Sequence, residues 1–253
     1  MSLFRPCIDL HDGKVKQIVG STLNDSESPE TNFVSDKTPE YYAELYKKDN
    51  LSGGHIIRLG KGNDEAARRA LSAWKNNLQL GGGINSANAR EWLDAGASQV
   101  IVTSAVFRDG IIDYEELDKL CYAVPSDRLV LDLSCRKADG KYLVVTDRWT
   151  RFTECEVNKT LLKRLAGCCS EFLIHAVDVE GKCSGIDVEL LKMLADNSPI
   201  TCVYAGGIRS FEDIYTLEER GAGRIAYTIG SALDIFGGSL SYREIADYSN
   251  REK

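Results

Sequence analysis

The stretch Gly82-Gly83-Ile84 recurs 124 residues later as Gly206-Gly207-Ile208. In both places an apolar, strand-like run leads into the glycines, and a segment with a helical pattern follows them. Two more pairs keep nearly the same spacing: Asp9 and Asp132 are 123 residues apart, and Ser104 and Ser231 are 127 apart. Three offsets that agree this closely indicate an internal duplication. We therefore expect two similar halves, at about residues 1–124 and 125–253.

Short β-branched runs alternate with longer amphipathic runs along the chain. The short runs predict eight strands, at residues 5–9, 55–60, 78–81, 99–104, 129–134, 171–177, 200–205 and 224–230. The amphipathic runs predict a helix after each strand, at residues 39–49, 63–75, 86–96, 113–122, 156–167, 186–196, 210–220 and 240–249. Continuous apolar strands are typical of a parallel sheet covered by helices. Eight such units with a two-fold repeat predict a single-domain α/β protein, a (β/α)₈ (TIM) barrel over residues 1–253, with an open doubly wound sheet as the alternative.

Two long connections occur at matching places, after the first and the fifth predicted strands. Residues 20–37 are polar and predict a long mobile loop, whereas residues 136–150 contain Asp139-Gly140 between two strand-like runs, which predicts a hairpin. The loops that follow barrel strands lie at the carboxyl ends of those strands, where active sites of this fold are built. Both connections are therefore candidate lids over one site.

Composition sets limits on the partners. The chain has 43% hydrophobic and 27% charged residues, which is ordinary for a globular protein with a sizeable core. Its formal charge of −7 and the lack of a lysine- or arginine-rich run argue against nucleic acid or an acidic membrane as partner. Because no apolar run approaches the ~18 residues of a membrane span and no signal segment precedes the first strand, we expect a cytoplasmic protein, and a monomer. The eight cysteines form no Cys-x-x-Cys pair and the three histidines are scattered, so we expect reduced thiols and no metal site.

Asp9 and Asp132 are the candidate catalytic residues. Each ends an apolar strand, where an unpaired carboxylate is costly, and strands one and five face each other across a barrel. Two carboxylates held in different environments can serve as general base and general acid. The alternative is that each aspartate only accepts hydrogen bonds from a neighbouring loop.

The glycine turns are candidate phosphate sites. Backbone N–H groups at Gly82-Gly83 and Gly206-Gly207 can approach an anion closely, and a following helix adds partial positive charge. Ser104 and Gly230-Ser231 follow the next strand in each half and add hydroxyl and N–H donors. Plain tight turns are the alternative, although the loops after strands seven and eight are the recurrent phosphate site of this fold. A molecule with a phosphate at each end and reacting carbons between them fits this arrangement.

Four other residues leave two interpretations open. Cys7 lies two residues before Asp9 and is either a thiolate base or a buried structural thiol. His175 and Asp178, at the end of strand six, either line the mouth or only support it. Trp149 either stacks on a heterocycle or holds its own hairpin together.

Five runs resemble one family closely and in order: Cys-Ile-Asp-Leu-His-Asp-Gly-Lys-Val from Cys7, Leu-Gly-Gly-Gly-Ile from Leu80, Leu-Asp-Leu-Ser-Cys-Arg-Lys from Leu131, Ala-Gly-Gly-Ile from Ala205 and Ile-Gly-Ser-Ala from Ile229. They are similar to the phosphoribosylformimino-5-aminoimidazole carboxamide ribotide isomerases of histidine biosynthesis. The resemblance implies a two-fold repeated barrel and a bisphosphate substrate with two ribose units. It also implies an Amadori rearrangement of an aminoaldose to an aminoketose, with no cofactor and no metal.

The resemblance also implies roles for individual residues. Asp9 matches the base and Asp132 the acid. The matching phosphate sites are Gly82, Gly83 and Ser104 for one end and Gly206, Gly207, Gly230 and Ser231 for the other. Trp149 matches a loop tryptophan that stacks on the substrate, and His175, Asp178 and Arg136 are further candidate contacts.

Three positions depart from the bacterial pattern: Ala176 stands where a threonine is usual, Gln17 where an arginine is usual, and Arg58 where an aspartate is usual. They are similar to the fungal-type branch of the family, in which Asp178 could compensate on strand six. Three alternatives remain at this point. They are the cyclase subunit of imidazole glycerol phosphate synthase, phosphoribosylanthranilate isomerase with a cysteine base, and a non-catalytic barrel that binds a phosphorylated metabolite.

Overall fold

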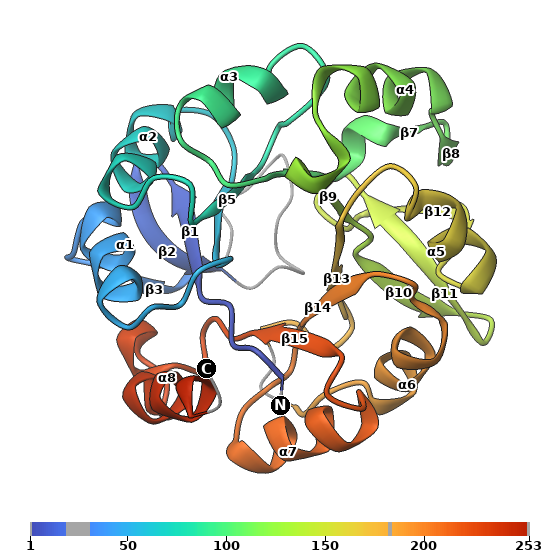
Figure 1. The fold of residues 1–253 in the computed structure, drawn as a ribbon. Helices are drawn as coiled ribbons and strands as arrows, with labels where there is room; N and C mark the ends of the chain where they lie inside the picture. The colour runs from blue at the N-terminus through green and yellow to red at the C-terminus, as the bar shows by residue number, and fades with distance from the viewer. Residues whose placement is uncertain (1, 19–30, 182–183, 252–253) are drawn as a thin grey trace.

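Eight parallel strands form the inner wall of the molecule, and helices surround them as an outer ring (Figure 1). The computed structural model describes residues 2–18, 31–181 and 184–251. The wall strands are β1 (Cys7–His11), β4 (His55–Arg58), β5 (Gln79–Gly81), β6 (Val100–Val102), β9 (Leu129–Asp132), β13 (Glu171–His175), β14 (Thr201–Ala205) and β15 (Ile225–Thr228). The helices are α1 (Pro39–Lys48), α2 (Asp64–Ala73), α3 (Ala89–Asp94), α4 (Tyr114–Ala123), α5 (Lys159–Leu165), α6 (Val188–Asn197), α7 (Phe211–Arg220) and α8 (Tyr242–Asn250). The (β/α)₈ barrel predicted from the sequence is confirmed, and the open sheet is excluded.

The wall closes between its first and last strands. From β1 the hydrogen-bonded order runs through β4, β5, β6, β9, β13 and β14 to β15. Phe4, just before β1, forms a parallel bridge with Tyr227 of β15. The amide of Arg5 donates to the carbonyl of Tyr227 at 2.8 Å, and the amide of Tyr227 donates to the carbonyl of Leu3 at 3.0 Å. Closure removes the free sheet edges on which an open sheet would risk pairing with other chains.

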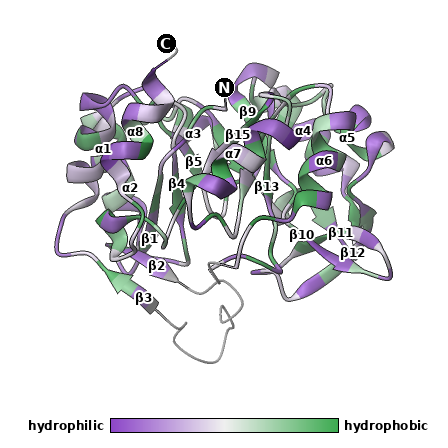
Figure 2. Ribbon diagram, turned by 90° about the horizontal axis from the view of Figure 1, so that it is seen from below, coloured by the Kyte–Doolittle hydropathy of each residue, from purple (hydrophilic) through white to green (hydrophobic). Residues whose placement is uncertain are grey.

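The strands are hydrophobic on both faces because both are buried, which explains their continuous apolar runs. Inside the barrel a small cluster packs across strands: Ile101, Val130, Leu173, Val203 and Ala226. A much larger core lies between the strands and the helices, whose apolar stripes face inward and whose polar faces point to solvent (Figure 2). In α7, for example, Ile214 and Leu217 are fully buried. Within the described residues, no helix is long and apolar enough to cross a membrane.

Most helix starts follow local capping chemistry; among the described helices, α2 and α3 begin without a side-chain cap. Thr38 and Ser210 accept hydrogen bonds from the third residue beyond them and cap α1 and α7. The helix predicted from residue 86 begins instead at Ala89 and has only six residues. Ser86 is drawn away from a capping position because its amide and hydroxyl both donate to Glu116, at 2.7 and 3.0 Å.

The two long connections add strands beside the mouth of the barrel. Part of the loop predicted at residues 20–37 is instead a strand, β3 (Thr31–Val34). It pairs with β2 (Lys14–Ile18), which in turn pairs with the end of β1. The predicted loop residues 20–30 lie outside the described residues. The predicted hairpin is confirmed as β10 (Cys135–Ala138) and β11 (Lys141–Thr146), turning at Asp139-Gly140. A third strand, β12 (Arg151–Glu156), was not predicted, and it delays the next helix from residue 156 to Lys159. Shorter elements complete the fold: β7 (Phe107–Arg108), β8 (Ile111–Ile112) and the 3-10 turns η2 (Ser104–Val106), η3 (Ser126–Arg128) and η4 (Asp234–Phe236).

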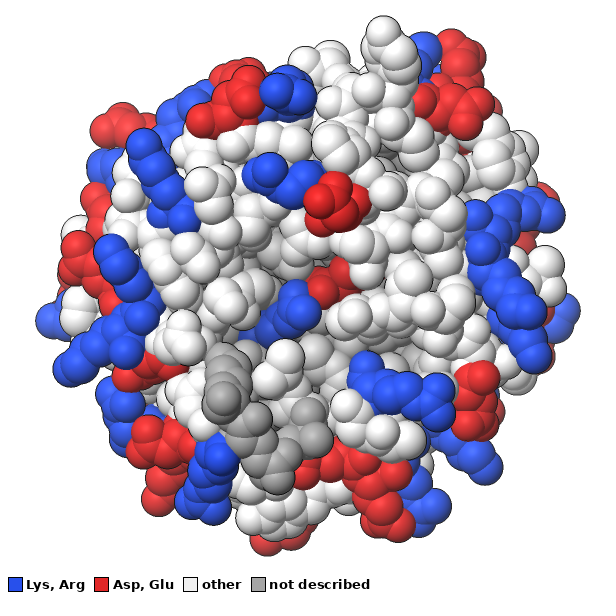
Figure 3. Space-filling view, in the orientation of Figure 1, with Lys and Arg blue, Asp and Glu red and all other residues white. Residues whose placement is uncertain are grey.

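The opposite end of the barrel, which carries the chain termini, is closed by polar side chains. Glu171 is 3% exposed and pairs with Arg5 at 2.5 Å and with the amide of Gln79 at 2.8 Å. On this face acidic and basic side chains alternate around the rim, and neither sign gathers into a patch (Figure 3). The added strands lie at the other end of the barrel, where Figure 2 shows β2 and β3 on one side and β10 to β12 on the other.

Candidate active site

Two adjoining hollows open at the carboxyl ends of the wall strands. The larger, here called the large lobe, has a volume of about 820 Å³, and the smaller, the small lobe, about 60 Å³. Four residues line both: Asp9, Gln17, His175 and Glu180. The two lobes therefore meet over one set of polar side chains, at the end of the barrel where this fold places its chemistry.

The structure divides the predicted site residues between the lobes as the internal repeat suggests. The large lobe contains Gly82, Gly83, Ser104, Asp132 and Trp149, and the small lobe contains Gly206, Gly207, Gly230 and Ser231. Each lobe thus receives one glycine turn and one serine. These turns leave backbone N–H groups and hydroxyls at the two ends of a combined cavity.

One glycine in each turn holds a sterically constrained position: Gly82 in the first turn, and in the second turn Gly207, whose repeat partner is Gly83. Both have positive φ, +89° and +75°. A Cβ on Gly82 would lie 2.1 Å from the carbonyl oxygen of Arg58, and a Cβ on Gly207 would lie 2.1 Å from that of Gly185. No other residue fits either position without moving backbone, so each turn is constrained by a close backbone contact, at its first glycine in the first half and at its second glycine in the second half.

Asp9 projects from β1 into the junction of the lobes. The side-chain amide of Gln17, on the adjoining strand β2, donates to its Oδ2 at 3.0 Å. Burial raises the pKa of Asp9 to about 6; the nearby charge of His175 opposes this rise, and that of Glu180 adds to it. At neutral pH this carboxylate is ionised yet binds a proton more strongly than an ordinary aspartate, which suits a general base.

Asp132 ends β9 within a hydrogen-bonded group. Its Oδ1 accepts from the amide of Ser134 at 2.9 Å and from the hydroxyl of Ser134 at 2.7 Å. The same hydroxyl is 3.2 Å from Nδ1 of His175, which lies 3.6 Å from Oδ1 of Asp132. Burial disfavours the charged form of His175, but Asp132, Glu180 and Asp9 together outweigh it and raise the pKa of His175 to about 9. His175 is therefore protonated at neutral pH and forms an ion pair beside Asp132.

Glu180 is a site residue that the sequence interpretation missed. Its Oε2 is buried with no hydrogen-bond partner within the described residues, and it approaches Gly206 so closely that a Cβ there would lie 3.1 Å away. Burial raises its pKa, and the charge of His175 lowers it again in part. The signal was present, because Asp178-Val179-Glu180 offers two carboxylates two residues apart, but the pattern does not show which one faces inward.

Asp178 and Arg136, predicted as substrate contacts, lie outside both lobes. The Nε of Arg136 donates to Asp178 at 2.9 Å, and the amide of Lys137 donates to the other carboxylate oxygen at 2.9 Å. Arg136 also lies over the ring of Phe152, 5.6 Å from its centre. Asp178 therefore stabilises the β10 segment in this structure. Glu180 lines the cavity, which is the place that the sequence predicted for Asp178.

Trp149 reaches the large lobe from the loop between β11 and β12. Its ring centre lies 5.4 Å from that of His175, with the planes tilted by 45°. Asp147, Arg148 and Trp149 all have positive φ, between 51° and 67°. Backbone strain of this kind gathers at functional sites, where neighbouring structure must maintain it. The indole therefore belongs to the cavity as well as to its hairpin.

The remaining candidates take supporting places. Cys7 donates from Sγ to the carbonyl of Ile229 at 3.6 Å, and burial raises its pKa well above the usual value, so at neutral pH it is a thiol and a poor base. Arg58 donates to the carbonyl of Gly82 at 2.5 Å, pairs with Asp64 at 2.6 Å and stacks on Trp92 at 4.2 Å. It holds the first glycine turn in place.

Fold and cavity together define a (β/α)₈ barrel in which two glycine turns and two aspartates line adjoining hollows at the carboxyl ends of the strands. The chain belongs to the histidine biosynthesis protein family, whose model matches residues 4–240.

Curated relatives agree with that membership. A protein of Medicago truncatula is 50% identical over 257 aligned residues. The alignment covers 99% of this chain and 82% of the plant protein. A Neurospora crassa protein is 48% identical with both chains fully covered, and a Saccharomyces cerevisiae protein is 46% identical with 95% of each covered. All three are named 1-(5-phosphoribosyl)-5-((5-phosphoribosylamino)methylideneamino) imidazole-4-carboxamide isomerase, and the plant protein is named as chloroplastic. Similarity to fungal proteins agrees with the fungal-type pattern of the sequence.

Proposed function

We propose that this protein is the isomerase that converts the phosphoribosylformimino-aminoimidazole-carboxamide ribotide aminoaldose to its aminoketose by an Amadori rearrangement in histidine biosynthesis. One observation carries the proposal: both aspartates line the large lobe, and each glycine turn with its serine lies at one end of the combined cavity. The names of relatives at 46–50% identity support the same reaction.

The first step is ring opening, which needs a proton donor. We assign it to Asp132 together with His175, because the imidazolium lies 3.6 Å from the carboxylate and Ser134 contacts both. Proton transfer from this pair to the furanose ring oxygen breaks the C1–O bond and leaves a protonated Schiff base. The protonated state of His175 at neutral pH keeps the donor charged before each turnover.

The second step is removal of the C2 proton, which we assign to Asp9. Loss of this proton sends the C2–H electron pair into the C1–C2 bond and neutralises the Schiff-base nitrogen, giving an enol that tautomerises to the ketone. A pKa near 6 lets Asp9 be ionised at neutral pH and still accept the proton. The chemistry requires only proton transfers, so we propose that no cofactor or metal takes part.

The phosphates are assigned to the two glycine turns. Gly82, Gly83 and Ser104 hold one phosphate, and Gly206, Gly207, Gly230 and Ser231 hold the other. Their backbone N–H groups bind an anion in a protein with a formal charge of −7, which therefore has to capture it locally. Trp149, beside His175, is placed to stack on the part of the substrate between the phosphates.

An absorbance assay with the ribotide aminoaldose tests the proposal. Asp9→Asn and Asp132→Asn should each lower kcat by at least ~10³-fold, within the usual range for loss of a general acid or base, while product binding measured by calorimetry persists. Asp178→Asn is the matched control, because this carboxylate pairs with Arg136 outside the lobes. Wild-type protein that binds the ribotide without turnover would refute the proposal in favour of a binding barrel, and turnover only of the ketose with ammonia would indicate the cyclase.

We further propose that the enzyme acts as a monomer in the cytoplasm, on a bisphosphorylated small molecule, with no nucleic-acid or membrane partner. One chain supplies both lobes and both aspartates, so no second copy is needed to complete the site. Light scattering at assay concentration checks the monomer: a dimer mass that persists on dilution would contradict it.

A further inference from the structure

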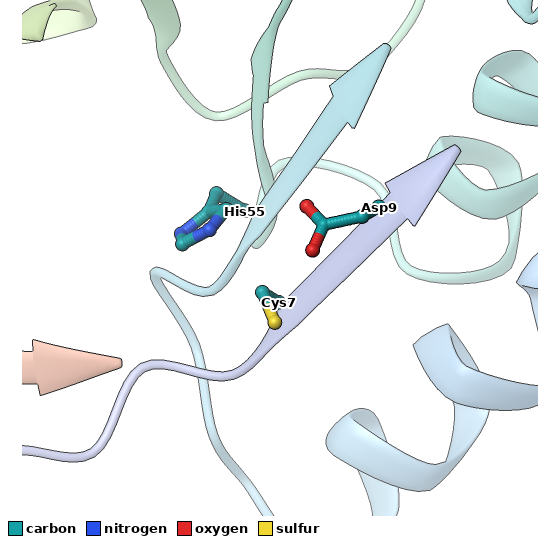
Figure 4. A group of neighbouring side chains, drawn as sticks. All are labelled: Cys7, Asp9 and His55. Atoms are coloured by element: carbon teal, nitrogen blue, oxygen red, sulfur yellow. The ribbon is translucent and has the colours of Figure 1, made fainter. Parts of the chain in front are cut away.

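The floor of the small lobe contains three different ligand types. Cys7, Asp9 and His55 each present one ligand atom, and these sulfur, oxygen and nitrogen atoms all lie within 4.8 Å of one another. Figure 4 shows the three side chains on the same side of two neighbouring strands. The protein family's reaction gives no role to this combination.

Strand register explains why the three meet. Cys7 and Asp9 are two residues apart on β1 and so point to the same face, and Cys7 is the direct register partner of His55 on β4. All three line the small lobe, although Cys7 and His55 are only 4% and 3% exposed. The barrel wall thus builds a compact donor set that is reached through the cavity.

We propose that Cys7, Asp9 and His55 bind a zinc-like divalent cation, and that the bound ion blocks turnover. A set of one thiolate, one imidazole and one carboxylate suits Zn²⁺, with water as the fourth ligand. Mg²⁺ demands oxygen ligands in octahedral geometry and does not fit this set. The proposal goes beyond the isomerase reaction, and its binding half does not depend on that reaction.

The geometry allows coordination with small side-chain movements. Ligands at ~2.0–2.3 Å from a tetrahedral zinc are ~3.3–3.8 Å apart, so the present spacing of up to 4.8 Å has to close by about 1.5 Å at most. The small lobe has a volume of about 60 Å³, and a water takes roughly 30 Å³ in the liquid, so an ion and its water have room.

Neighbouring contacts favour a cation at this place. The neutral side-chain amide of Gln17 donates to Asp9 at 3.0 Å and lies 4.0 Å from the sulfur of Cys7, so one N–H donor already faces both of these groups. Glu180, whose Oε2 lacks a hydrogen-bond partner in the described part of the chain, lines the same lobe and adds negative charge. On binding, the thiol of Cys7 releases a proton to solvent and its sulfur becomes a ligand.

The functional consequence rests on the role proposed for Asp9. A carboxylate that is bound to zinc cannot take the C2 proton, and the ion would occupy the small lobe, which the three residues line. Zinc should therefore inhibit by competing with the substrate. Removal of the metal by a chelator should restore the rate.

The test begins with metal binding alone. Metal-free protein is titrated with Co²⁺, followed by its sulfur-to-metal absorption band, and with Zn²⁺ in competition. We expect one equivalent with the band in the wild-type protein, at least ~100-fold weaker binding in both Cys7→Ser and His55→Gln, and unchanged binding in Cys121→Ser, an exposed cysteine far along the chain. Mg²⁺ should not compete.

The site is overturned if the wild-type protein shows no Co²⁺–sulfur band. It is also overturned if Cys7→Ser and His55→Gln bind the metal as tightly as the wild-type protein. Loss of binding in Cys121→Ser overturns it too, because the metal would then be on the surface. Thermal unfolding shows which variants fold; if one does not, the wild-type spectrum and the other variant decide. If zinc binds one equivalent at Cys7 but does not slow turnover, the site stands and its inhibitory role is overturned.

Discussion

The large and small lobes are built from the same repeated elements but differ in their surroundings. Gly82 and Gly207 have the same 2.1 Å constraint, yet the lobes differ in volume, about 820 against 60 Å³. In the second half α7 has ten residues and is capped by Ser210, three residues after Gly207. In the first half α3 has six residues, and five residues without helix, 84–88, separate it from Gly83. The repeated residues therefore supply two candidate phosphate sites, and only the second is followed by a long helix whose N-terminus adds partial positive charge.

Residues that are not repeated give the lobes different tasks. The guanidinium of Arg58 donates a hydrogen bond to the carbonyl of Gly82 in the first glycine turn. Trp149, from the loop between β11 and β12, lines the large lobe. Glu180 lies against the second glycine turn instead. We therefore expect the small lobe to close around a phosphate end and the large lobe to accept the bulkier end of the substrate.

The largest expected effect comes from adding a methyl group to either constrained glycine. Gly82→Ala and Gly207→Ala each force a Cβ onto a carbonyl oxygen at 2.1 Å with φ positive, so we expect a loss of about 3 kcal/mol or more in the free energy of unfolding. Chemical denaturation measures it, and kcat/KM should fall as the turn moves. Gly83→Ala is the control for stability alone: it has the same positive φ, +69°, but its Cβ would meet nothing within 4 Å, so it should cost less than the other two. A mild effect of Gly207→Ala beside a severe one of Gly82→Ala would contradict the equal constraint at these two glycines.

The next effect separates the proton donor from the base. The rate needs ionised Asp9 and protonated His175, so kcat/KM should fall below pH about 6 and above pH about 9. In His175→Gln we expect the alkaline limb to disappear and the plateau to drop ~30-fold, about 2 kcal/mol of transition-state stabilisation. The pH profile of kcat/KM checks both. An alkaline limb that stays in this variant would assign it to another group.

Much of this architecture could be predicted from the sequence because it depends on local patterns. Apolar runs identified the wall strands, and the equal spacing of Asp9, Gly82 and their repeats showed which residues would meet at the mouth. Their placement follows from topology alone, since the carboxyl ends of parallel strands share one edge. Once eight strands were assigned, the positions of the glycine turns were determined.

The rest depended on contacts between segments far apart in the sequence. Nothing local shows that Glu180, and not Asp178, faces inward; the loop backbone decides it, and Arg136 retains Asp178 outside. Strand register also places His55 beside Cys7 on the neighbouring strand, which their separation in the sequence does not show. Ser86 is a residue type that often caps helices, but here it hydrogen-bonds to Glu116.

A third prediction compares the aspartates as contributors to stability. The pKa of Asp9 is raised from 3.8 to about 6, so its ionised form opposes folding. This unfavourable contribution to the free energy of unfolding is absent below pH about 3.8. It grows as the pH rises from there through about 6, and it reaches at most ~3 kcal/mol. Asp9→Asn should therefore stabilise the protein by about 2 kcal/mol at pH 8 and by little at pH 4. Asp132→Asn should destabilise it at pH 8, because Asp132 accepts from Ser134 and pairs with His175. Calorimetry at the two pH values gives both signs, and equal signs would contradict the comparison.

The smallest expected effect concerns Glu180, the carboxylate of the small lobe. Its charge raises the pKa of Asp9, so Glu180→Gln should move the acid limb of kcat/KM toward lower pH, by less than about one unit. The substitution keeps the shape of the side chain, so the volume of the lobe and the approach to Gly206 are preserved. Asp178→Asn is matched in charge but lies outside the lobes, and it should leave the limb in place. If both variants shift the limb equally, the effect is one of overall charge, and the distinction between inward and outward carboxylates at the end of β13 is lost.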